Sequence, residues 1–90
     1  MNYTQLRAFH AVATSGGLTK AAAMLNVTQP AITRQLKLLE KEHGVVLFHL
    51  RGHSLELTEA GHTLFSLSQR ISRLMAEAAE AAANPANSRW

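Results

Sequence analysis

Residues 18–36 read LTKAAAMLNVTQPAITRQL and hold two short helical segments separated by a tight turn. The first segment is predicted to form a helix from Lys20 to Leu25, with Thr19 as its N-cap. Its three consecutive alanines keep the side chains small, so another helix can approach closely. Asn26 tolerates a positive φ and therefore marks the turn. Two helices joined in this way are typical of a helix-turn-helix.

The helix after the turn is predicted over residues 29–43. Thr28 is expected to cap it, and the side chain of Val27 to turn into the core. Pro30 falls in the first turn, where the N–H that proline lacks is not needed, and Gly44 ends the helix. This is the candidate recognition helix of the motif.

Further elements are predicted on both sides of the motif. Asn2 and Gln5 have the spacing of an N-cap and its reciprocal partner, and the glycines at residues 16–17 stop the helix that they begin. Residues 45–57 consist of two short β-prone flanks around a polar tip at 49–54, a pattern that predicts a small hairpin. The predicted fold class is mainly α, a winged helix-turn-helix with a three-helix head and a β-hairpin wing.

A long helix is predicted over residues 59–83, with Thr58 as its N-cap. Its apolar residues recur at alternating intervals of four and three, as in a coiled-coil seam. They are Ala60, Leu64, Leu67, Ile71, Leu74, Ala78 and Ala81. We expect two copies of the chain to dimerise through Leu67, Ile71, Leu74, Ala78 and Ala81. Packing of the seam on the chain's own first helix is the alternative, and both hold if Leu64 and Leu67 cover the head.

The helix over residues 29–43 has two chemically different faces. Ile32, Leu36 and Leu39 recur at helical spacing and are expected to face the core. The opposite face carries Gln29, Pro30, Thr33, Arg34, Lys37 and Lys41. In the DNA major groove glutamine can bond adenine and arginine can bond guanine, while lysine meets phosphates. This face predicts DNA binding. An RNA target is less favoured, because the narrow major groove of A-form RNA does not admit a helix.

The charge distribution agrees with a nucleic-acid partner. Residues 1–57 hold six basic and three acidic residues, whereas residues 58–90 hold three of each, so the net charge of +3 lies entirely on the first part. The chain contains no cysteine, which excludes disulfides and thiolate zinc sites. No apolar run approaches the ~20 residues of a membrane helix, and no signal peptide is recognisable. We therefore expect a cytoplasmic, nucleoid-associated protein without a membrane partner.

Other classes of function were weighed against DNA binding. His49 and His53 are four residues apart, but a predicted hairpin does not bring them together as a helix would, so no metal site is expected. No nucleophile elbow, phosphate-binding glycine loop or paired carboxylates are present, so no catalysis is expected. A pure protein-interaction module, with the seam as its working part, remains the alternative.

The sequence resembles the LysR-type transcriptional regulators. Residues 18–36 are similar to that family's signature, and the motifs GVVLF at 44–48 and LTEAG at 57–61 match its next two landmarks, so that residues 1–83 are covered without gaps. The resemblance implies a head at 1–58, a dimerising linker helix at 59–83, and a hinge beginning at 84–90. It further implies that the chain is a fragment of a regulator that is usually tetrameric. A C-terminal domain of two α/β lobes would then bind a small-molecule effector, and the fragment itself would need no cofactor.

The resemblance also implies roles for single residues. In the family, the residues matching Gln29, Pro30, Thr33 and Arg34 approach bases and backbone, and two such heads read an inverted-repeat operator. The full set of expected DNA-binding residues is Thr19, Lys20, Thr28, Gln29, Pro30, Thr33, Arg34, Lys37, Arg51 and His53.

The predicted wing departs from the family pattern at two positions. Leu50 and His53 replace arginines that enter the minor groove, and Arg51 is expected to point to the other side of the strand from Leu50. Histidine is only partly charged near neutral pH, so wing contacts are expected to be weaker than in the family and to strengthen as the pH falls.

Overall fold

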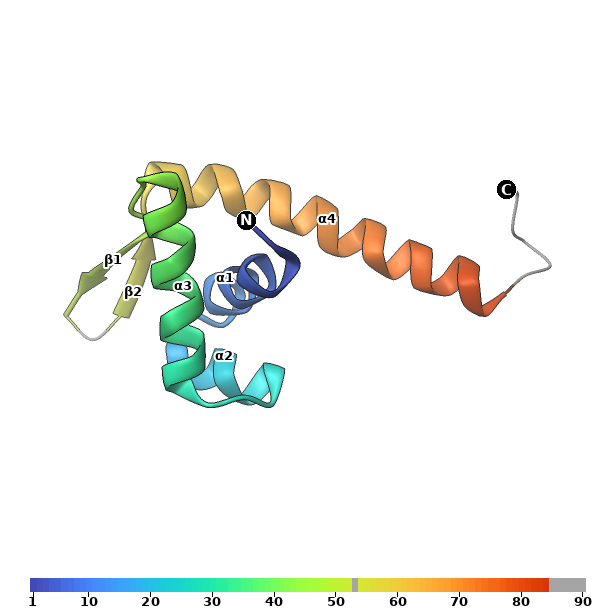
Figure 1. The fold of residues 1–90 in the computed structure, drawn as a ribbon, viewed down its shortest axis with the longest axis horizontal. Helices are drawn as coiled ribbons and strands as arrows, with labels where there is room; N and C mark the ends of the chain where they lie inside the picture. The colour runs from blue at the N-terminus through green and yellow to red at the C-terminus, as the bar shows by residue number, and fades with distance from the viewer. Residues whose placement is uncertain (53, 85–90) are drawn as a thin grey trace.

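The computed structural model describes residues 1–52 and 54–84 of the chain. Its elements in chain order are α1 (Tyr3–Ser15), α2 (Leu18–Leu25), α3 (Gln29–His43), β1 (Phe48–Arg51), β2 (Ser54–Leu57) and α4 (Glu59–Ala83). Figure 1 shows α1, α2 and α3 packed together, with the hairpin beside α3 and α4 leaving as a long rod. We call α1, α2, α3 and the hairpin the head. The molecule measures 50 × 25 × 20 Å, and the predicted fold class is confirmed.

Local capping signals are realised in α1 and α3. Asn2 and Gln5 form a capping box, in which the Gln5 N–H donates to Asn2 Oδ1 and the Asn2 N–H donates to Gln5 Oε1. Gly16 ends α1 in the left-handed conformation, with φ at 80°. Thr28 Oγ1 accepts from the Ala31 N–H at 3.3 Å and begins α3, and Gly44 ends it. The predictions for both helices are confirmed.

The start of α2 was predicted wrongly. The helix begins at Leu18, its N-cap is the extended Gly17, and no side chain caps it. Leu18 is drawn into the helix because its side chain packs against the core. Thr19 therefore lies inside the first turn, where its hydroxyl is free for another partner.

The inward turn expected of Val27 is also wrong, since 46% of its side chain is exposed. Asn26 has the expected positive φ of 56°, and its N–H bonds the carbonyls of Ala22 and Ala23. The Val27 N–H also donates to Ala22 O, at 3.0 Å. Backbone hydrogen bonds thus close the turn, and no buried side chain is required from Val27.

The strands of the hairpin lie nearer its tip than predicted, and the tip is shorter. The register pairs Phe48 with Leu57 and Arg51 with Ser54, so only residues 52–53 separate the strands instead of a tip at 49–54. Residues 45–47 do not belong to β1, because they dock on the end of α3. There the Leu47 N–H donates to Glu40 Oε2 at 2.7 Å. Leu47 itself is 2% exposed and belongs to the core.

The core lies where α1, α2 and α3 meet. Phe9, Val12 and Leu39 are fully buried in it, and the Phe48 ring of β1 lies 5.3 Å from the Phe9 ring. Ala21 faces this core from α2 and is also fully buried, which is the close approach that the alanine run predicted. The hairpin is therefore held to the head by an aromatic pair.

Helix α4 divides into a packed and a free part. Thr58 Oγ1 accepts from the Gly61 N–H at 3.0 Å and caps the helix, as predicted. Gly61 lies directly against the Leu47 carbonyl, and Ser68 is the last buried residue of the helix. From residue 69 onward the side chains are exposed, apart from Ala81, which is partly buried. Neither α4 nor any other helix of residues 1–52 and 54–84 is long and apolar enough to cross a membrane.

Candidate nucleic-acid interface

The outward face of α3 brings most of the predicted DNA-binding residues together. A shallow groove along this face is lined by Gln29, Pro30, Thr33, Arg34, Lys37, Leu38 and Lys41. The core face, made by Ile32, Leu36 and Leu39, is buried as predicted. Leu38 was missed because it breaks the polar pattern of this face. Leu38 follows Arg34 by four residues, and this spacing predicts that both lie on one side of the helix.

Carboxylates are held away from this groove. Neither of the two glutamates of α3 lines it. Glu40 accepts from the Leu47 N–H. Glu42 accepts from Gln5 Nε2 at 3.0 Å and from the α-amino group of Met1 at 3.3 Å. The pKa of Glu42 is lowered, mainly by the hydrogen bond from Gln5 and next by the one from the amino group of Met1. The groove is thus lined by cations and no carboxylate.

Thr19 and Lys20 join this surface from α2. They line a second groove with Gln29, at the side where the hairpin contributes Leu50 and Leu55. The Thr19 hydroxyl donates to Gln29 Oε1 at 3.3 Å. This bond orients the carboxamide of Gln29 at the start of α3, and the oxygen keeps a second lone pair for another donor. Thr19, which was wrongly predicted to be an N-cap, therefore contacts Gln29, a candidate for reading DNA bases.

The wing presents Leu50 and Arg51 on opposite sides. Leu50 is 72% exposed and faces the groove beside α2. Arg51 Nε lies 3.1 Å from Glu56 Oε2 across the hairpin, and both side chains are largely exposed. The expected orientation of Arg51 agrees with this geometry, but its ion pair with Glu56 could not be predicted from sequence spacing. His53 lies outside the described residues.

The seam of α4 lies on a different side of that helix from its contacts with the head. Gly61, Phe65 and Ser68 face the head and lie roughly a quarter of a turn from the seam. These three residues were not predicted to contact the head, although their own i, i+4, i+7 spacing is a signal for it. Among the seam residues, Leu64 packs on the core, and Ala60 and Leu67 line a pocket with Leu39 and Leu47 of the head.

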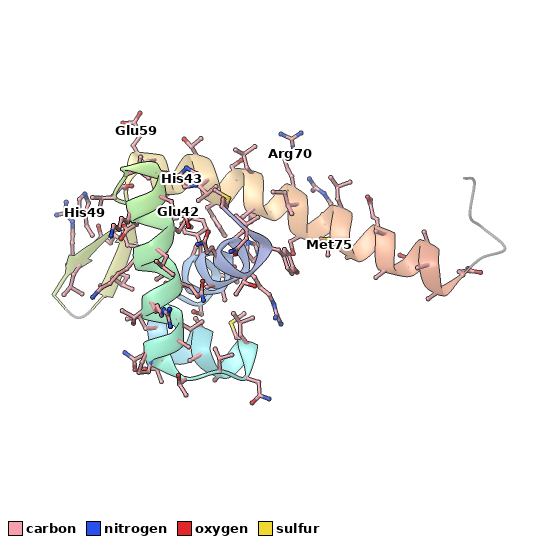
Figure 2. All side chains as sticks on the ribbon, in the orientation of Figure 1. Glu42, His43, His49, Glu59, Arg70 and Met75 are labelled. Atoms are coloured by element: carbon pink, nitrogen blue, oxygen red, sulfur yellow. The ribbon has the colours of Figure 1, made fainter. Side chains whose placement is uncertain are left out.

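The predicted dimerisation residues are mostly exposed. Leu67, Ile71 and Leu74 are 44%, 39% and 62% exposed, respectively. Ala78 is exposed and Ala81 is partly buried. Figure 2 shows Arg70 and Met75 on the part of α4 that extends away from the hairpin. Ser72 and Ala76 of this part border a groove with α1. Their role in pairing two copies stays a prediction.

Histidines and carboxylates do not gather into a metal site in the described part of the chain. No group of three or more such residues is placed to hold a metal ion there. His49 pairs with Glu56 across the hairpin, and Figure 2 shows it well apart from His43 at the end of α3.

Comparison with known proteins identifies the family. The family model described as "Bacterial regulatory helix-turn-helix protein, lysR family" matches residues 3–62. The chain belongs to the LysR family. It is a helix-turn-helix DNA-binding domain of that family and not an enzyme. The resemblance seen in the sequence is thereby confirmed.

Relatives and solved structures agree with this assignment. The chain is 45% identical over 74 residues to the HTH-type transcriptional regulator TcbR of Pseudomonas sp. strain P51, and 42% identical over 76 residues to the RuBisCO operon transcriptional regulator of Allochromatium vinosum. The matches cover 82% and 84% of this chain but only 25% of each relative, so the chain spans about a quarter of their length.

Two solved structures of LysR-type domains with DNA have the same fold. The CbnR_DBD–DNA complex has a TM-score of 0.81 at 39% identity and covers 97% of this chain and 100% of its own. The complex of BenM_DBD with catB site 1 DNA has a TM-score of 0.88 at 27% identity and covers 99% and 100%.

Proposed function

We propose that this chain is the DNA-reading end of a longer bacterial transcriptional regulator and that α3 enters the major groove of an operator. The observation that carries the proposal is the outward face of α3. It combines Gln29, Thr33 and Arg34 with two lysines, and no carboxylate lines its groove. An α-helix with its side chains is ~10–12 Å wide, which matches the width of the major groove.

Different residues of this surface are proposed to act on different parts of the DNA. Gln29 and Arg34 hydrogen-bond base edges, and Pro30 and Thr33 offer apolar contacts to thymine methyl groups. Lys37 meets phosphates, as do Lys20 and the start of α3 around Thr28, which add affinity without sequence information. The wing reaches the adjacent minor groove with residues 49–54, among which Leu50 contributes an apolar contact instead of a cation.

The rest of the chain is proposed to set the arrangement of two heads. Residues 1–58 form the head, the linker helix 59–83 pairs with a second copy, and residues 84–90 begin a hinge. The seam residues Leu67, Ile71, Leu74, Ala78 and Ala81 carry the pairing. Two heads joined in this way would read an inverted repeat, because the symmetry of the operator then mirrors that of the protein.

The part of the relatives that this chain does not span is proposed to contain the effector-binding domain. There a small molecule would bind, and the full-length regulator would assemble as a tetramer. The membership of the family and the quarter-length coverage of its relatives support this proposal. Such a regulator acts at the nucleoid, in the cytoplasm of a bacterium.

The test begins with selection of bound duplexes from a random library. We expect an interrupted inverted repeat, bound with an affinity that falls steeply as salt rises. Arg34→Ala is expected to lose about 1–3 kcal/mol of discrimination between specific and random DNA, whereas Lys37→Ala is expected to lower the salt slope by about one unit.

Arg70→Ala is the matched control for these substitutions. It removes the same charge from an exposed side chain of α4, which Figure 2 shows far from the groove of α3. We expect it to change neither quantity appreciably. Equal weakening on specific and random DNA by Arg34→Ala and Lys37→Ala would contradict the division between base-reading and phosphate-binding residues.

A further inference from the structure

One hydrogen bond joins the side chains of α1 and α4 within residues 1–52 and 54–84. His10 Nδ1 lies 2.8 Å from Ser68 Oγ. Ser68 is 2% exposed, and the His10 ring lies 5.6 Å from the ring of Phe65, one turn earlier on α4. The contact therefore joins a buried serine to a half-buried histidine beside an aromatic ring, at the point where α4 has its last buried residue.

The direction of this hydrogen bond follows from the single proton of the serine. Ser68 Oγ donates that proton to the Phe65 carbonyl at 2.9 Å. With its proton directed there, Oγ can only accept from His10, and Nδ1 then carries a proton; with the proton directed at His10, Nδ1 accepts instead. Burial lowers the pKa of His10, which favours the neutral ring. The Nδ1–H tautomer of the neutral imidazole is the one that lets Ser68 make both hydrogen bonds at once, because the hydroxyl has a single proton.

The bond lies where α4 leaves the head, so a change there alters the direction of the rest of the helix. From Ser68 to Ala83 the helix continues for ~22 Å with no further buried residue. A tilt of ~10° at Ser68 would move the far end by ~4 Å, which is close to the rise of one base pair. Small changes at this junction are therefore magnified along α4.

We propose that His10 and Ser68 are positioning residues that set the direction in which α4 leaves the head, and through it the spacing between two operator half-sites. The second part rests on the proposed function, in which α4 pairs two heads. Apolar contacts at Gly61, Leu64 and Phe65 hold the helix to the head. They do not fix its angle as a directional bond does.

The test uses a matched series of variants. Ser68→Ala and His10→Leu remove the bond and keep apolar bulk near Phe65. His10→Asn retains a donor, because the asparagine amide nitrogen lies near the position of Nδ1. Thermal melts followed by circular dichroism establish that each variant is folded before it is compared with the parent.

The direction of α4 is measured without DNA. The chain contains no cysteine, so Ala23→Cys on α2 and Ala79→Cys on α4, both exposed, can be spin-labelled selectively. Dilution with unlabelled protein restricts the electron–electron distance to one chain. We expect a broader or shifted distance distribution in Ser68→Ala and His10→Leu, and the parent distribution in His10→Asn. Unchanged distributions in both bond-deleting variants would overturn the proposal.

The tautomer gives a second readout that a purely steric role would not produce. Nitrogen-15 NMR of the His10 ring is expected to show a protonated Nδ1 in the parent and mainly a protonated Nε2 in Ser68→Ala. Protonation of the parent ring at Nε2 alone would contradict donation from Nδ1, because Nδ1 would then accept from the Ser68 hydroxyl.

The consequence for DNA is measured on selected half-sites separated by spacers that differ by single base pairs. We expect the bond-deleting variants to bind one half-site like the parent, but to lose roughly fivefold of the preference for the best spacer, as for one hydrogen bond. A parent spacer preference that both variants retain would overturn the effect on spacing. A parent protein with no spacer preference would contradict the proposed dimeric function. The spin-label distance distributions test the direction of α4 independently of that result.

Discussion

Helices α3 and α4 each bury one face on the head and leave the other in solvent, but the two free faces differ in chemistry. In α3, Leu39 is buried and Lys37 is exposed beside other polar groups. In α4, Ser68 is buried, while Leu74 remains 62% exposed. The free face of α3 is suited to a polyanion, whereas the free face of α4 is suited to an apolar protein surface. One chain thus offers two surfaces for two kinds of partner.

The physical reasons for binding also differ between these surfaces. An exposed lysine is well hydrated, and it gains free energy near DNA chiefly because counterions are released from the phosphates. An exposed leucine or isoleucine gains ~1.5–3 kcal/mol when its side chain is fully buried. Binding at α3 should therefore be sensitive to salt, whereas pairing at α4 should be sensitive to the loss of apolar area.

The largest effect is expected when a charge is placed on the free face of α4. Leu74→Glu should weaken dimerisation by roughly 100-fold or more, because both copies lose apolar burial and gain a carboxylate there. Sedimentation velocity over a range of concentrations measures the change. Ala76→Glu is the control, since it adds the same charge on the opposite side of α4. A Leu74→Glu protein that stays dimeric would show that the seam does not pair the copies.

The packed face of α4 is tested by Gly61→Ala. The new methyl group would meet the backbone carbonyl of Leu47, which cannot move aside as a flexible side chain would. We expect a loss of about 1–3 kcal/mol in the free energy of unfolding. For a domain of this size that is a fall in Tm of at least about 4 °C.

The same exchange at Gly17 provides the control for this prediction. Gly17 has an extended φ of −162°, and no atom lies near the position of an added Cβ. Gly17→Ala should leave the Tm almost unchanged. Equal melting of the two variants would mean that α4 is not held against Leu47 as the structure describes.

A smaller effect is expected at the wing, where the polar surface of the head meets an apolar residue. Leu50→Arg should strengthen DNA binding roughly two- to tenfold at low salt and steepen the salt dependence by about one unit, because it adds one phosphate contact. It should also favour A·T-rich sequences, whose narrow minor groove attracts arginine. Fluorescence anisotropy over a salt series measures both. Leu50→Gln, polar but uncharged, is the control, and an equal gain from it would exclude an electrostatic cause.

The smallest effect is the pH dependence of stability that arises from His10. Burial lowers the pKa of His10 in the folded state, so the unfolded chain binds the proton more readily. Stability is then full above the unfolded pKa of about 6.5 and falls as the pH drops through the lowered folded value. Urea unfolding between about pH 7.5 and 5 should show this loss, and His10→Asn should reduce it. An unchanged profile in the variant would assign the pH dependence to other groups.

Much of the local structure could be predicted because its causes lie within a few residues. The N-caps at Asn2, Thr28 and Thr58 depend on hydrogen bonds to the N–H three residues later. The two faces of α3 follow from helical periodicity alone. The candidate DNA-binding surface was therefore largely visible in the sequence, apart from Leu38.

Other features depend on partners that are distant in the sequence. Residues 45–47 leave the strand because Leu47 docks on Glu40 and buries its side chain. The positive charge of Arg51 is partly offset by the carboxylate of Glu56. Neither contact follows from periodicity or capping patterns, since each requires elements that only the folded chain brings together.

The sequence by itself determined the order of the helices, the N-caps of α1, α3 and α4, and the polar surface that α3 presents, because propensity, capping and periodicity act over one or two turns. Only the tertiary structure decided which side of α4 meets the head. The 4-3 seam suggested one side, but Gly61 fits against the Leu47 carbonyl and Ser68 bonds His10 on another. Close backbone approach and a part-buried hydrogen bond between residues 58 positions apart determine that choice, and Ile71 and Leu74 of the seam remain exposed.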